Sequence, residues 1–178
     1  TCALPISPDI EGRLLENIKA AEKAGADFIQ VTCSSMSPAV IKFKKEVNVP
    51  LLSIDEPVAE RLVNNYKKIG VIATASSTLN PSTELVEKLA KNSGKNIQVI
   101  SQFCEGAYNA FFAGNMEKHD QIVIENLKEL MGKSEAILLA QVSMARVVNS
   151  IPESEKTIPI ETSPEYAMKY LSNLIQSK

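Results

Sequence analysis

The chain has 178 residues, of which 44% are apolar and 22% charged, and its net charge is −2. This is an ordinary globular composition, large enough for one domain or two small lobes and without the basic surface that nucleic acids or anionic membranes attract. No apolar run approaches the roughly 20 residues of a membrane-spanning helix, and no secretory signal is visible. Three cysteines without framework spacing and a single histidine argue against a disulfide scaffold and a zinc site, so we expect a cytoplasmic protein without a metal.

The first seven residues, TCALPIS, do not resemble the rest of the chain. They match the translation of a common sequencing-adapter end, and we expect residues 1–7 to be foreign. The alternative is a genuine segment of ordinary loop composition. In either case Cys2 is left out of the functional reasoning.

From residue 10 onward, signals for helices and strands alternate. Helices are indicated by apolar residues at helical spacing and by Ser-Pro or Asn-Pro starts, and strands by short apolar runs. In chain order we expect a helix from 10 to a stop at Gly25, a strand at 28–32, a helix from Ser37, a strand at 50–54, a helix at 56–66, a strand at 69–73, a helix from Asn80, a strand at 97–103, helices at 108–112 and 117–131, a strand at 136–140, a helix at 144–149, a strand at 158–161 and a final helix from Ser163. This alternation predicts an α/β fold with parallel sheets covered on both faces.

Three predicted strands run into similar polar turns, at 32–38, 74–81 and 162–164. Ligands of open α/β sheets lie beyond the carboxyl ends of the strands, where helix N-termini and hydroxyl groups can bind small anions. Each turn alone is more simply a helix cap. Several such turns together with a cysteine favour a site.

Cys33 stands in the first of these turns, in the run VTCSSMSP. A thiol at a strand end before a helix can serve as a base or a nucleophile, although a buried structural cysteine is an equal alternative from position alone. Cys104 has no hydroxyl cluster, so we expect it to be structural. We expect His119 to lie on a solvated helix surface, and a role at the site is the alternative. Asp55 and the glutamate after it are either paired carboxylates or the start of a helix.

Three segments, VTCSSMSP at 31–38, IGVIATASSTLNPSTELVEKLA at 69–90 and AILLAQVSMARVV at 136–148, together resemble the aspartate/glutamate/hydantoin racemase superfamily. The resemblance covers the chain from residue 8 onward. It implies two pseudo-symmetric Rossmann-like lobes with parallel sheets, a cleft between them that holds the active site, and no cofactor. It also implies that a segment before residue 8 is missing, so that the first lobe is incomplete. We place the first lobe at 1–65, joined by the last helix at 163–178, and the second lobe at 66–162.

The resemblance also assigns the site residues. Cys33 matches the family's first-lobe cysteine and is the expected catalytic group. The expected substrate-binding residues are hydroxyl-bearing or line the opposite wall: Thr32, Ser34, Ser35, Thr74, Ser76, Ser77, Thr78, Gln141, Val142 and Ser143. Gln141 stands where the family usually has its second cysteine. Because an amide cannot exchange a proton at neutral pH, racemisation by two thiols is in doubt.

We therefore expect a cofactor-independent racemase- or isomerase-type enzyme that acts on a small carboxylate or amino-acid-like carbon acid through Cys33. The alternatives are a single-cysteine decarboxylase or cis-trans isomerase and a non-catalytic relative that binds a small carboxylate. A plain nucleotide-binding domain is disfavoured, because no glycine-rich phosphate loop is present. A homodimer is compatible with the resemblance, and a nucleic acid or membrane partner is not expected.

Overall fold

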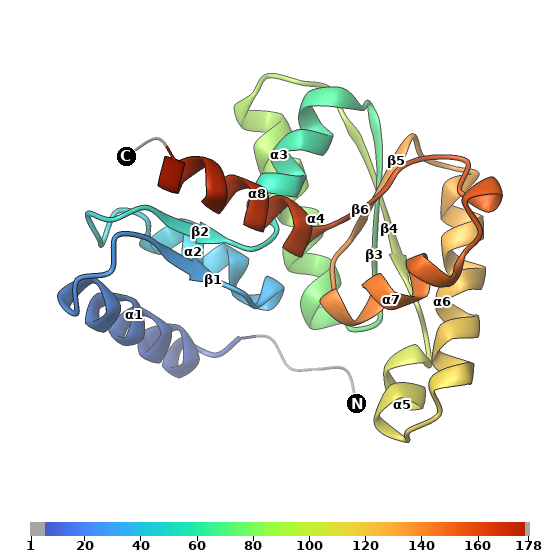
Figure 1. The fold of residues 1–178 in the computed structure, drawn as a ribbon, viewed down its shortest axis with the longest axis horizontal. Coiled ribbons are helices and arrows are strands. Elements are labelled where there is room, and N and C mark those ends of the chain that lie inside the picture. The colour runs from blue at the N-terminus through green and yellow to red at the C-terminus, as the bar shows by residue number, and fades with distance from the viewer. Residues whose placement is uncertain (1–5, 177–178) are drawn as a thin grey trace.

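The computed structural model describes residues 6–176 and shows an α/β fold built on two separate parallel sheets (Figure 1). The smaller sheet pairs β1 (Ile29–Val31) with β2 (Leu51–Ser53). The larger sheet has the strand order β4-β3-β5-β6 and is made of β3 (Lys68–Ala73), β4 (Gln98–Phe103), β5 (Ala136–Leu139) and β6 (Ile160–Thr162). The expected fold of two parallel-sheet lobes is confirmed.

Helices connect the strands, as parallel pairing requires. They are α1 (Pro8–Lys23), α2 (Ser37–Phe43), α3 (Glu56–Asn65), α4 (Ser76–Asn92), α5 (Ala107–Phe112), α6 (Met116–Met131), α7 (Ala145–Ser150) and α8 (Ser163–Gln176). Short 3₁₀ turns follow β1 and β5 at Ser34–Met36 and Val142–Met144, and a third lies at Glu153–Glu155. Within residues 6–176, no helix has the length and apolarity needed to cross a membrane.

The larger sheet is covered on both faces because successive strand residues point to opposite sides. Ile69 and Val71 of β3 pack with α3 and α4, whereas Ile72 packs with α6 and α7. Val71 and Ile72 are fully buried. Each apolar face of the strand therefore packs against its own layer of helices, which is why the sequences of β3 and β5 are continuous apolar runs.

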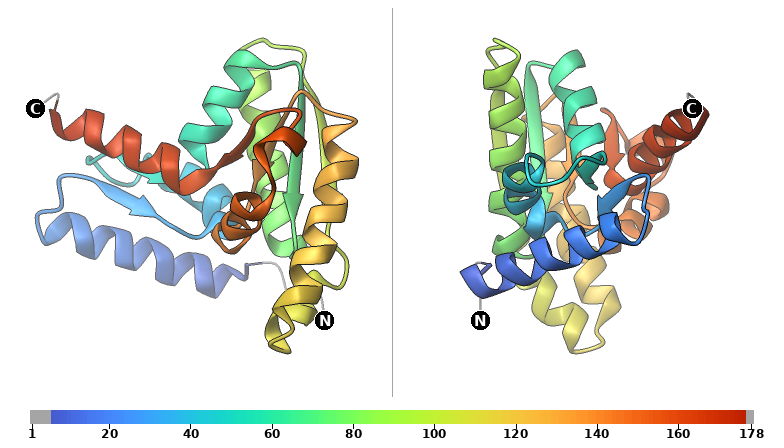
Figure 2. Two further views of the ribbon diagram at one scale, coloured as in Figure 1. Left: turned by 45° about the vertical axis from the view of Figure 1, so that its right-hand side comes forward. Right: turned by 90° about the vertical axis from the view of Figure 1, so that its left-hand side faces the viewer.

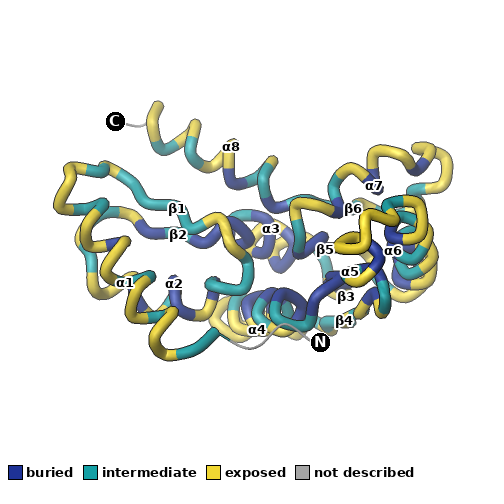
Figure 3. The backbone as a smooth tube through the Cα atoms, turned by 90° about the horizontal axis from the view of Figure 1, so that it is seen from below, coloured by how far each residue is buried: buried dark blue, intermediate teal, exposed yellow. Residues whose placement is uncertain are grey.

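The smaller sheet has a core of its own, made of Ile18, Ala39, Val40, Phe43 and Leu51 from α1, α2 and β2. Seen from below, α1 and α8 carry long exposed stretches, and the darkest segments gather around α3, α4 and the larger sheet (Figure 3). Most of the buried apolar surface therefore belongs to the larger sheet, and the smaller sheet is the weaker of the two units.

Helix α4 begins one turn earlier than expected. The prediction that Asn80-Pro81 opens this helix was wrong: it starts at Ser76, and Pro81 lies inside it. A proline this close to the helix start is tolerated, because its missing N–H leaves only one carbonyl, that of Ser77, without an i+4 donor. The 76–78 segment is consequently the first turn of a helix and not a free polar loop.

Two helices lie across the expected lobe boundary. Helix α3 follows β2 of the smaller sheet, yet its residues Val58 and Leu62 belong to the core of the larger sheet. Helix α8 packs against α3 and then extends away from the larger sheet (Figure 2). The division into residues 1–65 with 163–178 and residues 66–162 stays a prediction.

The two lobes are joined by a buried carboxylate. Asp55, at the start of α3, is completely buried, and its side chain does not cap that helix. It accepts hydrogen bonds from the hydroxyls of Ser34 (3.0 Å), Ser82 (3.1 Å) and Ser163 (2.5 Å). Burial raises the pKa of Asp55, and the three serine hydrogen bonds only partly offset this. One side chain therefore links the loop after β1, helix α4 and the start of α8.

The raised pKa of Asp55 contributes to the pH dependence of stability. When folding raises the pKa of a carboxyl group, that group stabilises the folded state at pH values below its unfolded-state pKa, which is near 3.8 for Asp55. This contribution is lost as the pH rises through the folded-state pKa. An asparagine has no such titration. Relative to the parent protein, Asp55→Asn should therefore gain stability as the pH rises from about 4 to about 7. Urea unfolding at several pH values measures this.

Asp120 provides a control of opposite sign for this pH dependence. Partial burial works to raise its pKa, but hydrogen bonds from His119 and Arg146 outweigh burial and lower it. Asp120→Asn should lose stability, relative to the parent, as the pH rises through the range below about 3.8, and should change little between about 4 and 7. Equal slopes for the two variants would contradict the assignment of Asp55.

Gly70 allows α6 to lie close to the sheet. A Cβ at this position would sit 2.8 Å from Cγ and Cδ2 of Leu130, which is fully buried. Gly70→Ala should therefore destabilise the protein by about 1–3 kcal/mol through overpacking. In Gly12→Ala on α1 the added methyl meets open space, so this control should stabilise the protein by up to about 1 kcal/mol. The free energy of unfolding in urea distinguishes the two.

Candidate active site

Three predicted site residues follow strand ends of the two sheets. Cys33 lies just beyond β1, Thr74 directly follows β3, and Gln141 lies just beyond β5. Because β3 and β5 are neighbours in one parallel sheet, Thr74 and Gln141 meet at the same edge. The backbone N–H and the hydroxyl of Thr74 both donate to Oε1 of Gln141, at 2.5 and 3.0 Å.

These two hydrogen bonds orient the Gln141 side chain. A backbone N–H can only donate, so the atom that it meets must be the amide oxygen and not the amide nitrogen. Thr74 is almost completely buried beneath this contact. Its two donors are therefore already used within the protein, and the NH₂ group of Gln141 is the part of the amide that can meet a ligand.

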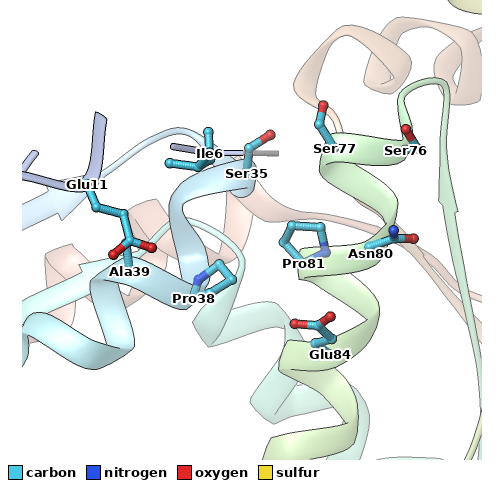
Figure 4. A pocket seen from close by; sticks show the side chains of 10 residues that line it. All are labelled: Ile6, Glu11, Ser35, Pro38, Ala39, Ser76, Ser77, Asn80, Pro81 and Glu84. Atoms are coloured by element: carbon cyan, nitrogen blue, oxygen red, sulfur yellow. The ribbon is translucent and has the colours of Figure 1, made fainter. Parts of the chain in front are cut away.

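A cavity of about 490 Å³ lies between α2 and the first turns of α4. Figure 4 shows Ser35 on one side of it, facing Ser76 and Ser77 on the other, with Glu84 farther along α4. Its complete lining is Ile6, Glu11, Ser35, Pro38, Ala39, Ser76, Ser77, Asn80, Pro81 and Glu84. The cavity thus combines three predicted substrate-binding serines from two segments more than 40 residues apart.

The loop after β1 also touches α4 directly. The hydroxyl oxygens of Ser35 and Thr78 lie 3.4 Å apart, within hydrogen-bond reach. Backbone N–H groups in the first turn of a helix lack helical partners, and Thr78 and Leu79 bond to the Ala75 carbonyl. The amides of Ser76 and Ser77 therefore come before the first bonded turn, where an anion is favoured.

The two described cysteines have contrasting surroundings. Cys33 is exposed and precedes the 3₁₀ turn after β1, and its side chain does not cap that turn. Cys104 is completely buried, and burial raises the pKa of its thiol to about 12. The expectation that Cys104 packs inside is confirmed. Cys2 lies outside the described residues.

Some predicted site residues do not line the cavity. Thr32, Val142 and Ser143 are exposed and do not line the cavity. Cys33 does not line it either and stands two residues before Ser35, which does. The hydroxyl of Ser34 is donated to Asp55. Of the two interpretations of Asp55, the helix start holds, although its carboxylate has a second role at the lobe junction.

The expectation that His119 is solvated was wrong. Its side chain is only 1% exposed, because α5 folds back on the start of α6 and places the Phe111 ring 5.6 Å from the imidazole. Nδ1 of His119 lies 2.7 Å from Asp120, which also pairs with Arg146 at the start of α7. This chain of contacts holds α7, and the Gln141 loop before it, against α6.

Sequence reasoning missed the residues that tie the site together. Ser82 and Glu84 were not singled out, whereas Asn80 and Ser163 were expected only as helix starts within the polar turns at 74–81 and 162–164. Their only signal was indirect: a polar residue at the end of an apolar strand, or on the buried side of a helix. In the described part of the chain, no group of three or more His, Cys, Asp or Glu side chains could hold a metal ion.

Comparisons with known proteins give a consistent result. Residues 6–167 match the family model described as Asp/Glu/Hydantoin racemase. A glutamate racemase from Aquifex pyrophilus is 27% identical over 157 residues, which is 85% of this chain and 60% of that protein. The chain thus spans less than two thirds of the length of this curated relative.

Two solved structures show the same fold. Glutamate racemase from Bacillus anthracis has a TM-score of 0.74 at 19% identity, over 95% of this chain and 65% of that one. Glutamate racemase from Francisella tularensis in complex with D-glutamate has a TM-score of 0.72 at 19% identity, with the same coverage of both chains. With a family model matched over 6–167 and the two-lobe fold shared, this chain belongs to the Asp/Glu/hydantoin racemase family.

Proposed function

We propose that the protein is a cofactor-independent racemase- or isomerase-type enzyme that acts on a small carboxylate or an amino-acid-like carbon acid, with Cys33 as the proton-transferring or nucleophilic group. One observation carries the proposal. The exposed Cys33 stands in the loop whose Ser35 reaches Thr78, beside a cavity lined by serines at the N-terminus of a 17-residue helix. A thiol and an anion site are thereby joined on one loop.

The chemistry of the cavity fits an amino acid. The start of α4 supplies hydroxyls and backbone amides from Ser76 and Ser77, which suit a carboxylate. Glu84, farther along the same helix, suits an ammonium group. The Francisella tularensis relative was solved with D-glutamate, which supports this substrate class.

The second face of the site differs from that of a two-thiol enzyme. The Gln141 oxygen is held by Thr74, so its NH₂ group can donate a hydrogen bond but cannot transfer a proton. Such a donor would stabilise the negative charge that develops when a carbon acid loses a proton or carbon dioxide. Gln141 therefore favours a reaction in which Cys33 handles the proton on one face. This keeps single-cysteine isomerases and decarboxylases within the proposal.

A non-catalytic carboxylate-binding protein is the second candidate, and Gln141 in place of a thiol is the observation that favours it. The two candidates agree on ligand binding and differ only in chemistry. Proton exchange into the substrate in heavy water separates them directly.

Cys33 should be the reactive thiol of the described residues. It is exposed, whereas Cys104 is buried with its thiol pKa raised to about 12. Iodoacetamide at pH 7.5 should therefore modify Cys33 more than about tenfold faster than Cys104, since the thiolate is the reacting form. Peptide mass spectrometry reads each site separately, and a bound dicarboxylate should slow the reaction at Cys33.

The matching variant tests the mechanism. Cys33→Ser should abolish proton exchange from glutamate, aspartate or malonate in heavy water and preserve thermal stabilisation by the same ligands, because the carboxylate contacts come from other groups. Cys104→Ser serves as the control and should retain exchange. Full turnover in Cys33→Ser would rule out the thiol mechanism.

Gln141 should act as a neutral donor toward the ligand. Gln141→Glu keeps the two Thr74 hydrogen bonds, since a carboxylate also accepts them, but it removes the NH₂ donor and adds a negative charge. Affinity for a dicarboxylate should fall about tenfold or more, equivalent to about 1.4 kcal/mol or more. Gln121→Glu, on the exposed surface of α6, makes the same charge change far from the cavity and should bind normally. Titration calorimetry at two salt concentrations compares them, and equal losses would remove Gln141 from the site.

A further inference from the structure

Ser34, the residue next to the proposed catalytic cysteine, is hydrogen-bonded at the lobe junction. Ser34 directly follows Cys33 in the chain, and its hydroxyl donates to Oδ1 of Asp55 at 3.0 Å. Sequence and resemblance predicted that Ser34 binds substrate, but its hydroxyl donates to a carboxylate that is completely buried. Any contribution of Ser34 to the reaction must therefore come from the position in which it holds the loop.

The Asp55 carboxylate strongly constrains the groups that are hydrogen-bonded to it. Its oxygens accept from three serine hydroxyls, and no Lys, Arg or His in the described chain forms an ion pair with it. A buried carboxylate without a cation depends on these hydrogen bonds, because water cannot replace a donor that is lost. The geometry of all three serines is consequently constrained more strongly than that of surface serines.

The three serines come from separate parts of the fold. Ser34 belongs to the Cys33 loop, Ser82 to α4, and Ser163 to the first turn of α8. The same loop has a second attachment to α4 through Ser35 and Thr78. Cys33 therefore precedes two consecutive residues whose side chains are both hydrogen-bonded, Ser34 to the buried carboxylate and Ser35 to Thr78 of α4.

We propose that Asp55 is a positioning residue for Cys33: through Ser34 it holds the thiol loop at a fixed place relative to α4 and its cavity. The catalytic part of this inference rests on the proposed function, whereas the ordering of the loop does not. Ser82, on α4 of the second lobe, and Ser163, at the start of α8, hold the same carboxylate, and neither belongs to the loop.

This division predicts different behaviour for three matched variants. Ser34→Ala, Ser82→Ala and Ser163→Ala each remove one hydroxyl donor from the same carboxylate. If the cluster served stability alone, all three would lower the melting temperature and affect the loop alike. If Asp55 positions the loop, all three lower the melting temperature, but only Ser34→Ala loosens residues 33–36.

Hydrogen–deuterium exchange measures the loop without any substrate. The N–H of Met36 is bonded to the carbonyl of Cys33 at 2.9 Å and reports on the order of this turn. In Ser34→Ala the exchange of this amide should rise about tenfold, the effect of about 1.4 kcal/mol on local opening. Ser82→Ala and Ser163→Ala should leave it within about twofold of the parent. Ser34→Thr keeps the hydroxyl and should restore slow exchange.

Asp55 itself is tested with two replacements. Asp55→Asn can accept from Ser34 and Ser163 and donate to Ser82, so it should keep the loop ordered, whereas Asp55→Ala should loosen it as Ser34→Ala does. If Asp55→Ala does not fold, Ser34→Ala still decides the matter. Similar loop exchange in all three serine variants, or unchanged exchange in Ser34→Ala, would overturn the proposal.

Kinetics then address the catalytic part. On a substrate that the parent turns over, Ser34→Ala should lower kcat by up to about 100-fold with KM nearly unchanged, since misplacing a reacting group by an ångström has effects of this size. Ser82→Ala should keep its kcat. If exchange responds as expected but Cys33→Ser retains turnover, the loop anchor stands and the thiol mechanism fails. If exchange is unaltered while Cys33→Ser is inactive, the reverse holds.

Discussion

The arrangement of this protein depends on one buried carboxyl group, Asp55, which forms no ion pair within residues 6–176. Asp55 is satisfied only by hydroxyls, and the chain brings them from positions 21, 27 and 108 residues away. A donor that far along the sequence arrives only if both sheets and the final helix are correctly placed. The carboxylate thus selects one relative placement of the two lobes, because any other leaves a polar atom buried without a hydrogen bond.

A large part of the fold was accessible from the sequence, since it rests on local patterns. The apolar runs at 69–73 and 136–140 predicted strands covered on both faces, and β3 and β5 are the central strands of the larger sheet. The start of α4 was misplaced because Pro81 looked like a first helical residue, whereas the chain tolerates it one turn later. His119 was misjudged because its charged neighbours suggested solvent, and the packing of α5 that buries it is a tertiary effect.

The candidate site divides in the same way. Strand-end residues such as Cys33, Thr74 and Gln141 could be named in advance, because parallel strands present their carboxyl ends on one side. The hydrogen bonds that these side chains form could not be named in advance. That Thr74 gives both its donors to Gln141, and Ser34 its hydroxyl to Asp55, follows from the spacing of side chains across sheets and lobes. The two lobes thus contribute different groups near the strand ends, an exposed thiol at Cys33 and an amide at Gln141 whose oxygen is held by Thr74.

The smaller sheet has a further consequence, which concerns the order of folding. Its two strands have three residues each, and a two-stranded sheet of this size has little stability of its own. The larger sheet, with helices on both faces, can assemble first from contacts between neighbouring β/α units. The contact between Ser163 and Asp55 closes a loop of 108 residues and carries the entropy cost of long-range closure. We therefore expect the smaller sheet, and with it the Cys33 loop that follows its first strand, to become ordered after the larger sheet.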